Sequence, residues 1–361
     1  MTQEQAVLFE LLRAGLWEKE VEDLSLFPLS ADSWQEIYLQ ARRQTVSGIV
    51  YRGLSYLPEA FFPPQPLLIR WVALVDRIEG KNRQMNLLLS QIADCFRRSG
   101  WMAVVQKGQG TASFYESPLL RECGDMDFYF PDSKAGEAVL SAMQAGGCQL
   151  KKAPDGSVSY FRKGILIEHH PDLLDLQNPF LRKKISAWIQ QYGFEEIALP
   201  DGGAEIFVPS PLLHLLLLNT HIMKHAFGLG VGLRQFCDLA RAYKSLQGRF
   251  DPDELRRLYA KAGIEKWSDL LHVFLTSYMG LPVECLPYPP EHTCDVRPLL
   301  EIVWQGGNFG QYQKGRAEAS QSVWLRKIHT FRAFCRNNRF AAAYAPQEAF
   351  WTAAKLLKGN I

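Results

Sequence analysis

The chain has 361 residues, of which 47% are hydrophobic, a composition typical of a globular protein that buries a substantial core. Its 40 basic and 38 acidic side chains leave a formal net charge of +2, so the overall charge does not favour binding to nucleic acid or to an anionic membrane. The N-terminal residues are acidic where a signal peptide is basic, and no apolar stretch reaches the roughly 18 to 20 residues of a membrane span, so we expect a cytoplasmic protein.

Residues 1–100 are expected to form an N-terminal helical region. Apolar residues recur at three- and four-residue spacing over 31–57 and again over 66–99, and prolines separate these two segments. The second segment leads directly into Trp101–Val105, a short run rich in β-branched residues that predicts the first strand of a different architecture. We therefore place a domain boundary at residue 100.

Residues 101–208 alternate between strand and helix patterns. Strands are expected at 102–105, 126–130, 158–161, 165–169 and 205–208, and helices at 109–116, 134–145 and 178–192. Such alternation predicts a domain built on a mixed sheet, and helical regions before and after it make the whole chain α+β in class.

Residues 209–361 are expected to form a C-terminal helical domain. Helical spacing covers 212–226, 233–245, 251–262 and 266–279, and a basic, aromatic tail begins at Val323. Acidic or polar residues interrupt the basic residues of the tail, so a solvated helix face explains them better than nucleic-acid binding. The residues concerned are Trp324, Arg326, Lys327, Arg332, Arg336 and Arg339.

The most informative pattern is a pair of acids on one expected strand, Asp125 and Asp127. Side chains alternate along a strand, so these two carboxylates should project together while Met126 and Phe128 face a core. Hard cations such as Mg²⁺ bind oxygen ligands, and two neighbouring carboxylates repel each other unless a cation or proton lies between them. The pattern therefore indicates a metal site, although two acids on the solvent face of a strand end would look the same.

The run Lys107-Gly108-Gln109-Gly110 lies between an expected strand and an expected helix. Small residues at such a turn let backbone amides approach a phosphate. The spacing matches neither a Walker loop nor a dinucleotide-binding loop, and glycine can serve backbone geometry alone. The acids that follow favour phosphate binding.

A third carboxylate occurs in the strand expected at 165–169. Alternation places Glu168 and His170 on one face and His169 on the other. Glu168 could complete a metal site or orient an attacking hydroxyl, and the alternative is a strand end with a hydrogen-bonded Glu and a solvated His.

Several motifs resemble the bacterial family of uncharacterised nucleotidyltransferase-like proteins within the polymerase-β-type superfamily, over roughly residues 67 to 245. In chain order they are Lys107-Gly108-x-Gly110, Tyr115-x-x-Pro118-x-x-Arg121-x-x-x-Asp125-Met-Asp127-Phe, Ile167-Glu168-x-His170, Pro211-x-x-x-Leu215-x-x-x-x-x-His221-x-x-x-His225 and Leu233-Arg234-x-x-x-Asp238-Leu239.

This resemblance implies that Gly108 opens the turn that holds a triphosphate, that Asp125 and Asp127 bind Mg²⁺ or Mn²⁺, and that Glu168 is the third carboxylate. The implied partners are an NTP, with ATP expected, and an unknown acceptor. The remaining nucleotide-binding candidates are Lys107, Gln109, Gly110 and Arg121. Candidates for contact with substrate or for support of the site are His170, His225, Arg234 and Asp238.

Three histidines lie in the helix expected at 212–226, namely His214, His221 and His225. The interval of four residues places His221 and His225 on one helix face. A zinc protease would need Glu at position 222, where Ile222 stands, so zinc is the less favoured interpretation. We expect this face to lie against the sheet domain instead.

Three functions are consistent with these patterns. The leading one is metal-dependent transfer of an NMP group from an NTP to a hydroxyl of a small molecule or protein. A catalytically inactive nucleotide- or partner-binding module is favoured by Gln109, where the superfamily usually has glycine or serine. A metal-dependent phosphohydrolase would use Asp127, Glu168, His169, His170 and Asp172.

Overall fold

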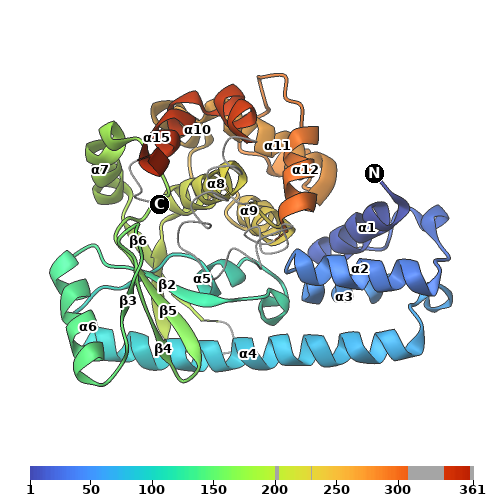
Figure 1. The fold of residues 1–361 in the computed structure, drawn as a ribbon, viewed down its shortest axis with the longest axis horizontal. Coiled ribbons are helices and arrows are strands. Elements are labelled where there is room, and N and C mark those ends of the chain that lie inside the picture. Colours follow the sequence, from blue (N-terminus) through green and yellow to red (C-terminus); the bar gives the residue numbers. More distant parts are fainter. Residues whose placement is uncertain (200–202, 229, 308–336, 358–361) are drawn as a thin grey trace.

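The computed structural model describes every residue except 200–202, 229, 308–336 and 358–361. A mixed sheet lies at one end of the molecule, with the N-terminal helices α1 to α3 beside it and the C-terminal helices above it, which confirms the predicted α+β class (Figure 1). Most of the basic tail, from Val323 to Arg336, falls outside the described residues, whereas Arg339 lies within the helical residues 337–344. Among the described helices, none is both long enough and apolar enough to cross a bilayer.

The N-terminal part of the chain is helical, as predicted. Its helices are α1 (Gln3–Trp17), α2 (Ala31–Arg43), α3 (Ser47–Leu54) and α4 (Gln65–Arg98). The helical pattern over 31–57 is interrupted because Thr45 adopts a positive φ of 53°, which ends α2 and reverses the chain into α3.

Two glycines allow α1 and α3 to cross in close contact. A Cβ atom added at Gly15 would lie 1.9 Å from the carbonyl oxygen of Ile49, and one added at Gly53 would lie 2.0 Å from that of Leu11. Both distances are far below van der Waals contact, so only glycine fits at either position.

The sheet has seven strands in the order β3-β4-β5-β2-β1-β7-β6. In chain order they are β1 (Val104–Val105), β2 (Asp125–Tyr129), β3 (Lys151–Lys152), β4 (Val158–Arg162), β5 (Ile165–His170), β6 (Phe194–Ala198) and β7 (Glu205–Pro209). The five predicted strands are confirmed. The sequence pattern missed β3 and β6, which are the two edge strands and therefore carry too few buried side chains to show alternation.

The remaining helices are α5 (Gln109–Ala112), α6 (Ser133–Ala145), α7 (Arg182–Tyr192), α8 (Pro211–Phe227), α9 (Leu233–Ser245), α10 (Pro252–Ala262), α11 (Glu265–Met279), α12 (Arg297–Gly306) and α15 (Pro346–Leu357). Helices α6 and α8 to α11 agree with the predicted helices to within a residue or two, whereas α7 begins four residues later than predicted and α12 was not predicted. Helix α5 is shorter than predicted because the amides of Phe114 and Tyr115 bond three residues back, which tightens and ends its last turn.

Helix α4 connects two hydrophobic cores. Its 34 residues span about 50 Å at 1.5 Å per residue, and Figure 1 shows it running beneath both the N-terminal helices and the sheet. Leu67 and Trp71 pack in the core shared by the N-terminal and C-terminal helices, whereas Leu89 and Phe96 pack against the sheet. The division of the chain into three domains stays a prediction. Helix α4 lies in the predicted N-terminal region but also packs against the sheet of the next predicted domain.

The two faces of the sheet have different roles. Met126 and Phe128 of β2 face the core that contains α6 and the second half of α4. Tyr129 points to the other face and packs with the helical core that includes α8 and α9. The candidate site lies on this second face.

Candidate active site

The pairing of β2 with β5 brings the predicted acids together. These strands are parallel, and their register places Asp127 directly beside Glu168. Because side chains alternate, Asp125, Asp127 and Glu168 project from the same face, while Met126 and Ile167 are buried on the other. The facing predicted from the sequence is confirmed.

Asp127, Glu168 and His170 form a tight cluster. One potential ligand atom from each lies within 4.8 Å of the others, and no other trio of His, Cys, Asp or Glu side chains in the described part of the chain has this spacing. His170 Nε2 lies 2.7 Å from Asp127 Oδ1 and 3.7 Å from Glu168 Oε2. His170, expected only to contact substrate or support Glu168, therefore belongs to the cluster itself.

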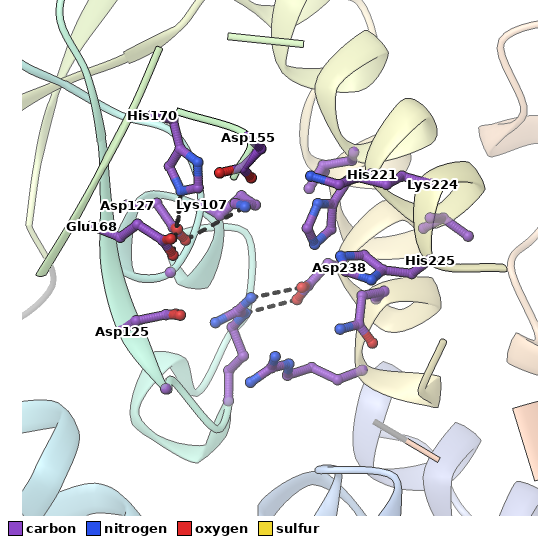
Figure 2. A pocket seen from close by; sticks show the side chains of 17 residues that line it. Lys107, Asp125, Asp127, Asp155, Glu168, His170, His221, Lys224, His225 and Asp238 are labelled. Atoms are coloured by element: carbon purple, nitrogen blue, oxygen red, sulfur yellow. Dashed lines mark hydrogen bonds and ion pairs between the residues drawn. The ribbon is translucent and has the colours of Figure 1, made fainter. Parts of the chain in front are cut away.

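Asp125 lies on the same wall but outside this cluster (Figure 2). The nearby charge of Asp127, and then burial, raises the pKa of Asp125 above its ordinary value. The expected trio of metal ligands was Asp125, Asp127 and Glu168, whereas the closest trio has His170 in place of Asp125. Asp125 remains close enough for electrostatic repulsion from Asp127.

Two nitrogen-containing side chains compensate the charge of Asp127. Lys107 Nζ lies 3.6 Å from Asp127 Oδ2, and His170 bonds the other carboxylate oxygen. Burial alone would raise the pKa of Asp127, but Lys107 and His170 outweigh it and hold that pKa well below its usual range. Asp127 is therefore ionised, and the ammonium group of Lys107 provides a positive charge beside it.

The turn after β1 presents only its first two residues to the cavity. Lys107 and Gly108 line it, and Gly108 has a φ of +63°, a conformation that favours glycine. Gln109 is 2% exposed and does not line the cavity, and a Cβ atom at Gly110 would lie 2.9 Å from a side-chain carbon of Val208. The unusual residue Gln109 thus places no side chain in the site.

A cavity of about 220 Å³ separates the sheet from α8 and α9. Figure 2 shows the acids and His170 on one wall and His221, Lys224 and His225 on the other. The lining residues are Lys107, Gly108, Arg121, Gly124, Asp125, Asp127, Asp155, Glu168, His170, Leu218, His221, Ile222, Lys224, His225, Arg234, Gln235 and Asp238. The expectation that the histidine face of this helix lies against the sheet domain is confirmed.

The helical wall contains a hydrogen-bonded group centred on Asp175, which lies in the segment after β5. Its Oδ2 is 2.8 Å from His221 Nδ1, and its Oδ1 accepts a hydrogen bond of 2.7 Å from Lys224. The rings of His221 and His225 are 4.5 Å apart, edge to face. Burial and the charge of Lys107 together lower the pKa of His221 to about 4, although Asp175 opposes them.

Arg121, predicted to bind the nucleotide, is instead paired with Asp238. Its Nε and Nη2 each donate a 2.7 Å hydrogen bond to a different oxygen of Asp238, to which Tyr115 also donates. The side chains of Arg121 and Asp238 are 5% and 4% exposed. Arg121 lines the cavity, but its guanidinium is committed to Asp238 and connects the segment before β2 to α9.

Arg234, the other arginine at the cavity, donates a 2.6 Å hydrogen bond to the carbonyl of Glu122. Arg234 is therefore held by the segment before β2 as well. His225, Arg234 and Asp238, expected to contact substrate or to support the site, all line the cavity.

The residue set of a phosphohydrolase is not brought together. His169 points to the opposite face of the sheet, where its ring stacks 5.1 Å from that of Phe130. Asp172 lines a separate cavity of about 350 Å³ rather than the one that contains Asp127. His214 is also buried away from the cavity, 3.3 Å from the hydroxyl of Thr111.

Sequence patterns missed several residues of the site, including Asp155, Asp175 and Lys224. Lys224 lies three residues after His221, so helical spacing places it near that histidine's face and could have indicated it. Asp155 and Asp175 lie in segments between elements, where no periodicity indicates the direction of a side chain.

Comparison with known proteins gives one family and one solved structure. A family described as uncharacterised nucleotidyltransferase matches residues 30–280. No curated protein matches this chain. The crystal structure of an antigenic nucleotidyltransferase-like protein from Paracoccidioides brasiliensis is 15% identical, with a TM-score of 0.33 and coverage of 55% of this chain and 93% of that one, a likeness too weak to support an argument. The family match extends over most of the chain, so the protein belongs to the family of uncharacterised nucleotidyltransferases.

Proposed function

We propose that this protein transfers an NMP group from an NTP to a hydroxyl of an acceptor, with Mg²⁺ or Mn²⁺ bound by Asp127 and Glu168. The observation that carries the proposal is the cluster of Asp127, Glu168 and His170 beside Lys107, within a cavity of about 220 Å³. Family membership supports nucleotidyl transfer in general, and the cavity supports the finer statement about the metal.

The donor atoms of the site fit a divalent cation. Asp127 and Glu168 offer carboxylate oxygens, and Asp125 lies on the same wall with a pKa raised by the charge of Asp127. A divalent cation would relieve this repulsion, and carboxylate sets of this kind suit Mg²⁺ and Mn²⁺. The imidazole of His170 is a ligand that Mn²⁺ accepts more readily than Mg²⁺ does. When bound, the cation supplies positive charge that stabilises the transition state at the α-phosphate.

The basic side chains of the cavity suit a triphosphate. Lys107, Lys224 and Arg234 all line it, and their positive charges favour the binding of phosphate groups there. Lys107 Nζ lies 3.6 Å from Asp127 Oδ2. A cation at Asp127 would compete with Lys107, and the ammonium group would then pair with the bound phosphates.

The two walls of the site can position a nucleotide and an acceptor hydroxyl. The acids of the sheet wall face the imidazoles of the helical wall across the cavity. Positioning of the reactants and electrostatic stabilisation are the main contributions that a protein makes to phosphoryl and nucleotidyl transfer.

Nucleotide transfer can be tested with α-³²P-labelled NTPs, Mn²⁺ or Mg²⁺ and a cell extract as the source of acceptor. The wild type is expected to label an acceptor, and Asp127→Asn should lower the rate by about 100-fold or more because it removes a carboxylate from the cluster. Asp94→Asn, an exposed acid of α4 far from the cavity, serves as the matched control and should keep full activity.

Two outcomes would contradict the proposal. Nucleotide binding by the wild type without any transfer would identify an inactive binding module. Release of phosphate without label on an acceptor would identify a hydrolase, which the separate positions of His169 and Asp172 argue against.

A further inference from the structure

We propose that His221, oriented by Asp175, is the general base that takes the proton from the acceptor hydroxyl, an inference that rests on the function proposed above. The geometry that carries it is a carboxylate-imidazole pair on the wall of the cavity opposite the Asp127 cluster.

Asp175 determines which nitrogen of His221 carries the proton. An ionised carboxylate only accepts hydrogen bonds, so His221 Nδ1, 2.8 Å from Asp175 Oδ2, must be the donor. The neutral ring then has its lone pair on Nε2. Lys224 donates to the other oxygen of Asp175 at 2.7 Å, which holds the carboxylate ionised and in place.

The pair lies where an acceptor and a nucleotide could meet. His221 lines the cavity that contains Asp127, and Asp175 lines the neighbouring cavity of about 350 Å³. Asp155, His170 and Lys224 line both cavities, so the two adjoin beside this pair. The larger cavity gives an acceptor room to approach while its hydroxyl reaches the first.

The carboxylates of the opposite wall are less suited to the role of base. Asp127 is paired with His170 and Lys107, and the Oε1 atom of Glu168 is hydrogen-bonded to Ser157 at 2.9 Å. A carboxylate that also binds a cation loses basicity to it. The proton acceptor should therefore come from the helical wall.

The charges around His221 keep it neutral and able to accept a proton. Burial, Lys107 and Lys224 together lower its pKa to about 4, although Asp175 opposes them. His225 on the same helix has a pKa lowered by burial and by His221, so it adds no fixed charge. An anionic triphosphate in the cavity would raise the pKa of His221 and strengthen it as a base.

The proposed step balances as a simple displacement. The acceptor O–H proton passes to His221 Nε2 as the oxygen forms a bond to the α-phosphorus of the NTP. The bond from the α-phosphorus to the bridging oxygen breaks, and pyrophosphate leaves with the electron pair. The proton on His221 then passes to solvent, and Asp175 stabilises the transient imidazolium throughout.

The test compares His221→Gln with two other variants, using α-³²P-ATP, Mn²⁺ and the extract fraction that the wild type labels. His221→Gln should lower kcat by about 100-fold or more while KM for ATP stays within about threefold. Asp127→Asn should lose both activity and Mn²⁺ binding. His292→Gln is the matched control, because His292 also bonds a carboxylate, Asp269, but does not line the cavity, and it should behave as the wild type.

Two further measurements separate a base from a structural residue. Added imidazole should restore part of the activity of His221→Ala, and the restored rate should follow the pKa of substituted imidazoles. In ¹⁵N-histidine NMR spectra of the metal-free protein, the resonances lost in His221→Gln should report a neutral ring protonated on Nδ1 at pH 7.

Each failure has a distinct meaning. Wild-type kcat in His221→Gln, together with an inactive Asp127→Asn, would overturn the role of His221 and leave the proposed function intact. A loss that imidazole does not restore, or a ring protonated on Nε2, would assign His221 a structural role. Absence of transfer by the wild type would overturn both proposals.

Discussion

The ion pair of Arg121 and Asp238 should contribute far more to stability than a surface pair. Two hydrogen bonds of 2.7 Å join the guanidinium to both oxygens of Asp238, and Tyr115 adds a third bond of 2.7 Å. Both charged side chains are almost completely buried. Removal of one partner therefore leaves the other charge almost completely buried and without its counter-charge.

The magnitude follows from this burial. An exposed pair contributes about 0 to 1 kcal/mol, whereas loss of one partner of a buried pair costs about 3 to 5 kcal/mol. We expect losses of that size in the free energy of unfolding for both Asp238→Asn and Arg121→Met. The double variant Arg121→Met/Asp238→Leu buries no charge, so it should lose far less than the sum of the single variants, with a coupling energy of about 3 kcal/mol or more.

Urea unfolding at several pH values measures these losses. Burial alone would raise the pKa of Asp238, but Arg121 outweighs it and lowers that pKa below its ordinary value. A lowered folded-state pKa stabilises the protein above the unfolded-state pKa, and the stabilisation disappears as pH falls through the folded-state value. The difference between the wild type and Asp238→Asn should thus be full at pH 7 and shrink below about pH 4.

The reasoning would be refuted by single variants that cost less than about 1 kcal/mol, or by a double variant that costs the sum of the two. Either result would mean that water screens the pair. Arg121 would then be available for the phosphate contact that its place in the sequence motif suggests.

Three other predictions follow from the structure. Gly53→Ala should destabilise the protein by about 1 to 3 kcal/mol or more, because the added Cβ would meet the Leu11 carbonyl. Gly80→Ala has open space around it and should stabilise α4 by about 0.5 to 1 kcal/mol. Thermal unfolding measures both changes. Asp125→Asn should stabilise the metal-free protein at pH 7. The charge of Asp127 raises the folded-state pKa of Asp125, so ionised Asp125 opposes folding. The gain in stability should vanish below about pH 4, and a loss of stability at pH 7 would contradict the prediction. Mn²⁺ at 100 times its Kd should stabilise the wild type by about 2.7 kcal/mol and Asp127→Asn hardly at all, and chelation should reverse the effect.

Much of the sheet wall could be predicted from the sequence, because the direction of each side chain depends only on its position along its own strand. Alternation alone places Asp125 and Asp127 on the face opposite Met126 and Phe128, and the structure confirms this facing. The strand that carries Glu168 was predicted in the same way. Period-two patterns report the facing of side chains reliably wherever one face of a strand is buried.

The spatial arrangement of the cluster could not be predicted in the same way. Nothing in the sequence pattern shows that β5 pairs with β2 in parallel, or that the register sets Asp127 beside Glu168. A shift of that register by two residues would keep every facing and separate these acids. The membership of His170 in the cluster depends on this register, and so sequence reasoning assigned His170 only a supporting role.

The two walls of the cavity come from distant parts of the chain, and Arg121 and Asp238 join them. Arg121 precedes the strand that carries Asp127, and Asp238 lies on α9, which packs beside the helix that carries His221. A short, bidentate ion pair permits little change in the distance between the elements that it connects. We therefore expect Arg121 to fix the separation of the Asp127 cluster from the imidazoles. A sequence motif cannot distinguish this role from contact with a nucleotide.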